Sequence, residues 1–290
     1  MKRSKTIGLF IIAAIYAIAV FIGFALFFSV SELHINWRIL IGDVGATIFV
    51  FLTGVALKNA SVYDPYWSLA PIVVLTGVLL LFDVLNIGKL LLIFTVLYWG
   101  VRLTCNWAYT FKNLATQDWR YDKLKRVFPR AFQLVSFLGI NMFPTIVVYL
   151  CLLPGIAFLE ESAFTLLTTV GFAVCIAATT LQLMSDIQMH RFKRKNADAH
   201  LLIRDGLWKH SRHPNYLGEI LMWWGVYIMM LSSVPGRWFL AIGPVVNTLM
   251  FLFVSIPLAD KHNRETRLGF DEYVLETNSL LPFKIKRAAK

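Results

Sequence analysis

The sequence has 290 residues, of which 58% are hydrophobic and only 16% are charged. A soluble domain normally carries about a quarter charged residues, so this composition excludes an ordinary soluble protein. The formal net charge of +11 is typical of cytoplasmic loops that face anionic lipid headgroups, or of a pocket for an anionic ligand.

Long apolar runs follow one another along the chain and predict membrane-spanning helices. About 20 apolar residues span a bilayer core, and most of the runs reach that length. In chain order the eight runs are Ile7–Val30, Ile39–Leu57, Trp67–Phe82, Leu90–Thr110, Phe132–Leu153, Ser162–Met189, Tyr216–Leu231 and Trp238–Leu258. We therefore expect an all-α fold, a polytopic transmembrane helix bundle of about eight spans within a lipid bilayer.

The loop charges favour an even number of spans. The segment before Ser162 carries Glu160 and Glu161, whereas lysine and arginine cluster at Lys2–Lys5, Lys112–Arg130, Arg191–Arg212 and Lys261–Lys290. With eight spans, all of the basic clusters lie on one side of the membrane, which the positive-inside rule places in the cytoplasm. Both termini are then expected in the cytoplasm.

Ionisable residues gather at the end of the sixth run. Asp186 and His190 are four positions apart and so share a helix face near the membrane edge, and Arg191 and Lys195 follow. An ionisable group at membrane depth is costly and is therefore a functional candidate. The alternative is an ordinary basic flank of a membrane span.

The seventh run begins with polar residues. Pro214 stiffens the start of this helix, and Asn215, Glu219 and Trp223 follow at intervals of one helical turn. An amide, a carboxylate and an indole therefore share one stripe of an apolar helix. This stripe is either a binding site or a buried hydrogen-bonded network that joins helices.

One motif in the C-terminal third resembles a known family. It reads Arg212-His213-Pro214-Asn215-Tyr216-Leu217-Gly218-Glu219, is followed by Trp223, and precedes a second segment, Gly269-Phe270-Asp271-Glu272-Tyr273. The pattern resembles the steroid 5-alpha-reductase C-terminal family, and more closely its bacterial branch, which is catalogued as a domain of unknown function (DUF1295). Isoprenylcysteine carboxyl methyltransferases carry a similar Arg-His-Pro-x-Tyr-x-Gly segment and bind S-adenosylmethionine instead.

The resemblance implies that NADPH is held within the helix bundle, which suits a chain without a GxGxxG motif between a strand and a helix. By motif, the adenosine ribose and phosphates would be held by Asp186, Arg191 and Lys195. The nicotinamide half would be surrounded by Asn215, Tyr216, Glu219 and Trp223. The tail positions that close over the cofactor match His262 and Arg264, and the predicted cofactor-binding set is completed by Arg204, Arg212 and His213. Arginine suits such a ligand because its guanidinium binds phosphate bidentately.

The resemblance also implies a division of labour along the chain. Residues 1–130 are expected to form N-terminal transmembrane helices with the substrate-side residues. Residues 131–290 are expected to form a C-terminal reductase-like region with cytoplasmic cofactor-binding loops. Together they would make one structural unit.

The substrate-side residues are expected between the second and fourth runs. In the reductases, a glutamate preceded by a glutamine helps a tyrosine bind the ketone of the substrate. The nearest match is Tyr63-Asp64, and the tyrosine partner falls at about Tyr98, so we predict Asp64 and Tyr98 as catalytic residues, with Tyr63 or Tyr66 as other possible donors. The alternative for Asp64-Pro65 is a helix N-cap followed by proline at the first helical position.

The expected activity is NADPH-dependent reduction of a C=C bond conjugated to a ketone in a lipophilic substrate, steroid-like or isoprenoid. Hydride would come from the nicotinamide, while a protonated Asp64 and a tyrosine stabilise the enolate oxygen. Two alternatives stay open: a membrane methyltransferase that uses S-adenosylmethionine, and a non-catalytic membrane protein on the same fold.

Other classes are not favoured. The histidines form no repeated HxxH boxes, so no metal site is expected. No module that stacks on or reads bases is present, so no nucleic-acid partner is expected. The bacterial resemblance favours a bacterial inner membrane, with the cofactor site facing the cytoplasm.

Overall fold

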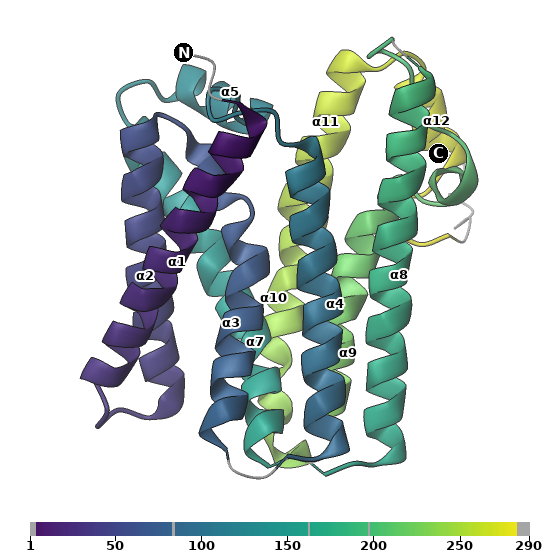
Figure 1. Cartoon of the computed structure of the whole chain (residues 1–290). Coiled ribbons are helices and arrows are strands. Elements are labelled where there is room, and N and C mark those ends of the chain that lie inside the picture. The colour runs from purple at the N-terminus through teal and green to yellow at the C-terminus, as the bar shows by residue number, and fades with distance from the viewer. Residues whose placement is uncertain (1–3, 83–84, 162, 197, 283–290) are drawn as a thin grey trace. The chain divides into compact units, whose positions relative to one another are not determined.

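The computed structural model describes residues 4–82, 85–161, 163–196 and 198–282. These residues form helices joined by turns and loops, and no strand occurs among them (Figure 1). The all-helical fold class is therefore confirmed. Lys2, Arg3, Ser162 and the chain from residue 283 onward, which belong to the predicted basic clusters and to the start of the sixth run, lie outside the described ranges.

The chain divides into two compact units, Met1–Glu160 and Glu161–Lys290. Helix α7 (Phe143–Glu160) packs against α2, α3 and α4 and so belongs to the first unit. The expected division of roles at residue 130, within one structural unit, stays a prediction.

The first unit is built from long apolar helices. Its longer helices are α1 (Lys5–Ser29), α2 (Ile35–Leu57), α3 (Tyr66–Leu81), α4 (Ile87–Thr110) and α7, and its shorter ones are η1 (Ala60–Tyr63), α5 (Trp119–Val127), α6 (Phe132–Val135) and η2 (Ser136–Met142). Side-chain caps begin three of the long helices: the Ser4 hydroxyl accepts from the Ile7 N–H, His34 Nδ1 from the Asn36 N–H, and Asn86 Oδ1 from the Lys89 N–H. These caps satisfy backbone donors that the helix itself leaves unpaired.

Helices α1 and α2 pack closely because glycines face each other between them. A Cβ atom on Gly42 would lie 2.7 Å from the carbonyl oxygen of Gly23. Small residues that let two backbones approach are typical of helix pairs in membranes.

The second unit contains one long helix and several shorter ones. They are α8 (Leu166–Lys195), η3 (Gly206–Lys209), α9 (Pro214–Leu231), η4 (Pro235–Ala241), α10 (Ile242–Met250), η5 (Phe251–Ser255), α11 (Ile256–Thr266) and α12 (Phe270–Glu276). Helices α8 and α9 lie side by side (Figure 1). A Cβ on Gly171 would lie 2.8 Å from the Gly225 carbonyl oxygen, and one on Gly218 would lie 2.6 Å from the Ala178 carbonyl oxygen. The absence of side chains at these glycines brings the two backbones together.

Within the described residues, seven helical segments are long and apolar enough to cross a membrane. They are Lys5–Ser29, Ile35–Leu57, Ala60–Leu81, Ile87–Thr110, Phe132–Glu160, Leu166–Lys195 and Pro235–Thr266. The eighth predicted span, Tyr216–Leu231, forms the 18-residue α9 but is not among them. Asn215 and Glu219 at its start lower its hydropathy, and its length of about 27 Å only approaches the thickness of a bilayer core.

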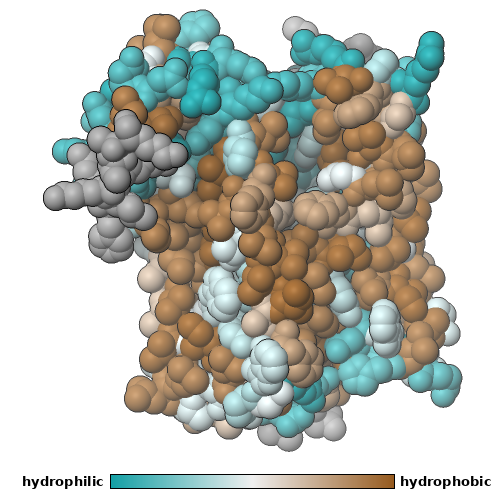
Figure 2. Space-filling view, turned by 180° about the vertical axis from the view of Figure 1, so that it is seen from behind, coloured by the Kyte–Doolittle hydropathy of each residue, from teal (hydrophilic) through white to brown (hydrophobic). Residues whose placement is uncertain are grey.

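The surface of the helices suits a lipid environment. Large apolar side chains are exposed along them, such as Phe10, Phe21 and Phe253, each more than 70% exposed. On the face shown in Figure 2, hydrophobic residues cover the middle of the helices and hydrophilic residues gather near their ends. The lengths of the helices and their exposed apolar side chains both indicate a multi-pass membrane protein.

Candidate functional site

The start of α9 carries the polar stripe that the sequence predicts. The Trp223 Nε1–H donates to Glu219 Oε1 at 3.0 Å, and both side chains are buried. The side-chain amide oxygen of Asn215, Oδ1, is also buried, and it has no hydrogen-bond partner among the described residues. An unsatisfied buried acceptor costs free energy, so this oxygen is ready to accept from a ligand donor.

Tyr216, the next predicted residue, is held between two rings. It stacks on His213 with ring centroids 5.1 Å apart and packs on Phe251 with centroids 4.9 Å apart. Its side chain thereby links the start of α9 to η5.

Arg212 and His213 converge on one carboxylate, that of Asp260 on α11. The Arg212 Nη2–H donates to Asp260 Oδ2 at 2.8 Å, and His213 Nε2 lies 2.8 Å from Asp260 Oδ1. The Arg212 Nη1–H also donates to the Thr277 carbonyl oxygen. Arg212 and His213 are almost fully buried, so Asp260 neutralises charge that would otherwise be costly. Sequence reasoning missed Asp260, although a lone acid at the end of an apolar run is itself a signal.

The backbone after α12 lies along the same segment. The Arg212 N–H donates to the Asn278 carbonyl oxygen at 2.9 Å, and the His213 N–H donates to the Ser279 carbonyl oxygen at 3.0 Å. The Tyr273 hydroxyl donates to the Trp208 carbonyl oxygen. Burial raises the pKa of Tyr273, so this phenol stays protonated and remains a donor at neutral pH. We call residues 273–279, held in this way, the C-terminal clasp.

The loop before α9 is attached to α8. Gly206 has a φ of +58°, and a Cβ there would lie 2.6 Å from Gln188 Oε1. The same Gln188 oxygen accepts from the Leu207 N–H at 2.9 Å, and the Trp208 indole donates to the Ser185 carbonyl oxygen at 3.2 Å. Glycine is required here because the backbone is left-handed and the side-chain space is taken.

Two more of the predicted cofactor-binding arginines contact residues of the tail. Arg204 donates to the Gly269 carbonyl oxygen, and its Nη1 lies 3.6 Å from Glu276 Oε2. Arg264 donates from Nε to Asp271 Oδ1 at 2.7 Å. Their charges are therefore matched within the chain, and their role in cofactor binding stays a prediction.

The end of α8 is different, because its cations point into solvent. Arg191, Arg194 and Lys195 are exposed and make no ion pair with any residue that the structure describes. Asp186 and His190, one turn earlier, are partly buried, and so is His262 on α11. This end of α8 therefore offers a concentrated positive surface.

The predicted catalytic residues lie in the first unit. The Tyr121 hydroxyl, from α5, donates to Asp64 Oδ1 at 2.5 Å. Burial raises the pKa of Tyr121, and the nearby Asp64 carboxylate raises it further. Tyr98 lies on α4, where its ring stacks on Phe94. Sequence reasoning gave Tyr121 no role.

The structure corrects the capping alternative for Asp64. Helix α3 begins at Tyr66 with Pro65 as its N-cap, and no side chain caps it. Asp64 instead ends the preceding turn η1, so its carboxylate is available to Tyr121. The other possible donors also have partners: Tyr63 lies 2.7 Å from Thr145 Oγ1, and Tyr66 donates to Asp43.

Comparison with known proteins gives a family but no established activity. Residues 50–277 match the family model described as "Protein of unknown function (DUF1295)". An uncharacterised protein of Schizosaccharomyces pombe is 25% identical over 200 residues, which cover 59% of this chain. The match spans 57% of that protein, less than two thirds of its length. No solved structure shows a significant match.

Proposed function

Since the chain belongs to the DUF1295 family, whose function is unknown, we propose a function from the chemistry of its own residues. We infer that it is an NADPH-dependent membrane reductase. Its substrate would be a lipophilic molecule, steroid-like or isoprenoid, with a C=C bond conjugated to a ketone. We also propose that it resides in a bacterial inner membrane with both termini and the cofactor site on the cytoplasmic side.

The observation that carries this proposal is the buried, unpartnered carbonyl oxygen of Asn215 beside the Glu219–Trp223 pair. A carboxamide such as that of nicotinamide has two N–H donors, and it needs acceptors in a site from which water is excluded. Asn215 Oδ1 is such an acceptor, and Glu219 presents carboxylate oxygens one helical turn away. These acceptors therefore suit the carboxamide N–H groups of the nicotinamide half.

The phosphates of the cofactor need cationic side chains that are not already ion-paired with carboxylates of the chain. Arg191 and Lys195 at the end of α8 meet this condition, because they are exposed and not ion-paired with other described residues. Arg212 does not meet it, since it is bonded to Asp260 and Thr277. In this proposal Arg191 and Lys195 hold phosphate, whereas Arg212 and His213 hold the C-terminal clasp in place.

NADPH, when bound, would supply hydride to the β-carbon of an enone. The task of the chain is then to bind the ketone and stabilise negative charge that develops on its oxygen. We propose Asp64 and Tyr98 as the groups that donate to this oxygen. Tyr121 would act as a positioning residue, because its hydroxyl fixes the orientation of the Asp64 carboxyl group.

A second candidate is favoured by one specific observation. Several cations that the sequence would assign to phosphate binding are neutralised within the chain by Asp260, Asp271 and Glu276. S-adenosylmethionine carries a net positive charge and needs fewer cationic partners, and its ammonium group would also suit Asn215 and Glu219. A membrane methyltransferase is therefore the alternative, and a non-catalytic membrane protein is the remaining one.

Thermal shift of the detergent-purified chain with NADPH, NADH and S-adenosylmethionine separates these functions. A ligand that binds only the folded protein at a hundredfold its dissociation constant stabilises it by about 2.7 kcal/mol. We expect NADPH to stabilise most, and the double variant Arg191→Ala, Lys195→Ala to weaken its binding roughly 10- to 100-fold. The charge-matched control is Arg126→Ala, Arg130→Ala, which removes two exposed cations from the first unit.

A second pair of variants tests the nicotinamide end. Asn215→Leu should weaken NADPH binding about 5- to 10-fold, the value of one hydrogen bond. Asn247→Leu is the matched control, because Asn247 on α10 is also a buried amide with one unpartnered polar atom among the described residues. Stabilisation by S-adenosylmethionine alone would replace the reductase with the methyltransferase. No stabilisation by any of the three would favour the non-catalytic protein.

A further inference from the structure

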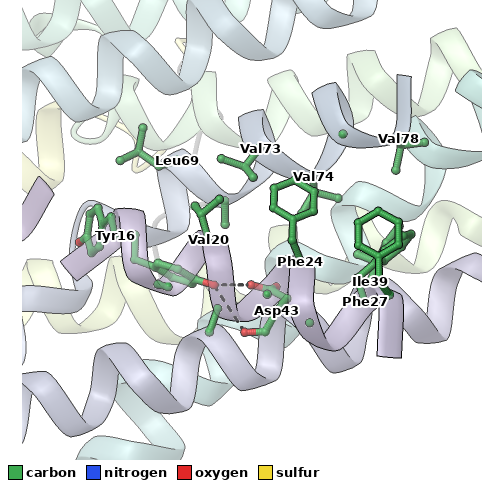
Figure 3. A pocket seen from close by; sticks show the side chains of 18 of the residues that line it. Tyr16, Val20, Phe24, Phe27, Ile39, Asp43, Leu69, Val73, Val74 and Val78 are labelled. Atoms are coloured by element: carbon green, nitrogen blue, oxygen red, sulfur yellow. Dashed lines mark hydrogen bonds between the residues drawn. The ribbon is translucent and has the colours of Figure 1, made fainter. Parts of the chain in front are cut away.

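The first unit contains a cavity of about 260 Å³ between α1, α2 and α3 (Figure 3). Its wall is almost entirely aliphatic and aromatic, with Val20, Phe24, Leu69 and Val74 among its members. A cavity of about 150 Å³ already admits benzene, and small-molecule pockets begin near 300 Å³. The space is therefore large enough for the apolar body of a small lipophile.

One carboxyl group interrupts this apolar wall. Asp43 lies in α2, and its Oδ1 accepts from the Tyr66 hydroxyl at 2.8 Å (Figure 3). Among the described residues this is the bond that the Asp43 carboxyl group makes, and no cation there pairs with it. The other polar side chains of the wall are those of Tyr66 and Tyr16, and Tyr16 already donates to the Val62 carbonyl oxygen. Asp43 is thus a wall residue with one carboxylate oxygen that no described residue occupies.

The depth of Asp43 limits what can bond to this oxygen. Asp43 follows the first residue of α2, Ile35, by eight positions, or about 12 Å along the helix axis. The hydrocarbon core of a bilayer is about 30 Å thick, so Asp43 lies well below the headgroups. A phospholipid would bring only an acyl chain to this depth and would leave the carboxyl group unsatisfied. A matching occupant carries its polar atom inside the hydrocarbon region.

The cavity opens toward the lipid. Phe24, Phe28, Leu80 and Leu81 line it and are also exposed on the surface of the unit. A molecule dissolved in the bilayer would therefore meet an apolar rim before it reaches Asp43. Neither Asp64 nor Tyr98 is among the described residues of the wall, so this cavity is separate from the proposed catalytic residues.

We propose that this cavity binds a neutral lipophile with a single hydroxyl or carbonyl group, and that this group bonds to Asp43. A hydroxyl donates to the free carboxylate oxygen, and a carbonyl accepts from the protonated acid, so either satisfies the group that the wall leaves unpaired. The site lies wholly within the first unit, and it holds whether or not the second unit binds NADPH.

The experiment measures binding of tritiated farnesol to the full chain in lipid nanodiscs. Unlabelled farnesol, geranylacetone (with a single unconjugated ketone) and farnesane, the saturated hydrocarbon, are the competitors. We expect saturable binding, with farnesane competing at least about fivefold more weakly than farnesol, because it cannot bond to Asp43. Asp43→Leu should remove this preference while keeping the apolar wall.

A filling variant tests the cavity itself. Val74→Phe adds a ring to the wall and should weaken the binding of farnesol and geranylacetone at least tenfold. Ile48→Phe is the matched control, because it adds a ring to the exposed side of α2 and should leave binding unchanged. If Val74→Phe does not give a monodisperse protein, a diazirine analogue of farnesol is used with wild type and should label residues of α1, α2 and α3.

Three results would overturn the proposal: no saturable binding of either oxygenated probe, equal competition by farnesol and farnesane, or labelling outside the three helices. The NADPH thermal shift measured on the same variants keeps the two proposals apart. Asp43→Leu and Val74→Phe should leave that shift unchanged.

Discussion

The sharpest prediction concerns Asp260→Ala, which removes the carboxylate shared by Arg212 and His213. Breaking a buried ion pair by removing one partner costs about 3–5 kcal/mol. Here the carboxylate side chain is 17% exposed and Arg212 keeps its bond to the Thr277 carbonyl oxygen, which lowers the cost. We therefore expect the C-terminal clasp to lose about 2–3 kcal/mol of its stability against local opening.

Hydrogen exchange followed by mass spectrometry measures this loss directly. The Arg212 and His213 amides donate to the Asn278 and Ser279 carbonyl oxygens, so they exchange only when the clasp opens. A loss of 2–3 kcal/mol should raise their exchange rate roughly 30- to 150-fold. Asp271→Ala is the control, since it breaks an exposed ion pair with Arg264 and should change nothing measurable. Unchanged exchange in Asp260→Ala, or an equal response to Asp271→Ala, would refute the role of Asp260.

Three further predictions follow from the packing and the hydrogen bonds. Gly225→Val should lower the free energy of unfolding by about 1–3 kcal/mol, because its Cβ would lie 2.5 Å from Cys175 Sγ and force α8 and α9 apart. Gly139→Val is the control, because the space around Gly139 is open, and it should not have this effect. Gly206→Ala should destabilise the loop before α9 by about 1 kcal/mol or more, and hydrogen exchange at Leu207 reports the release from Gln188. The pKa of Tyr121 is raised in the folded protein, so its contribution to the free energy of unfolding should be constant below about pH 10. Above that pH the stability should fall, because only the unfolded phenol loses its proton. Tyr121→Phe should flatten this fall in denaturation curves taken from about pH 8 to 11.

Local patterns predict the features that depend on local geometry. A spacing of four residues places Glu219 and Trp223 on one helix face whatever surrounds them, and their hydrogen bond agrees with that expectation. The long apolar runs likewise predict the helices, because a membrane span must satisfy its backbone groups internally. The eighth run forms a helix but not a candidate span, because the polar residues that make α9 a candidate site also lower its hydropathy.

Long-range pairings could not be predicted in the same way. Asp260 meets His213 across 47 positions of sequence, and Asp64 meets Tyr121 across 57. No periodicity links such residues, since their contact depends on how a loop returns to the helices. The cavity at Asp43 was missed for the same reason: its wall combines three helices, and nothing in the local sequence around Asp43 reveals the space beside it.

The internal pairing of cations changes how the positive charge of the second unit should be interpreted. Sequence alone assigns Arg204, Arg212 and Arg264 equally to an anionic ligand, yet each donates to an oxygen of the chain itself. Moving Arg212 to a phosphate would leave the partly buried Asp260 without its cation, and the gain in binding would be offset by that loss. The exposed pairs of Arg204 and Arg264 oppose such a move only weakly. Arg191 and Lys195 face no such cost, because no carboxylate of the described chain is ion-paired with them. An anionic ligand therefore gains the most binding free energy at the end of α8, whereas a cationic ligand gains the least there. Replacing Arg191 and Lys195 consequently distinguishes an NADPH site from an S-adenosylmethionine site.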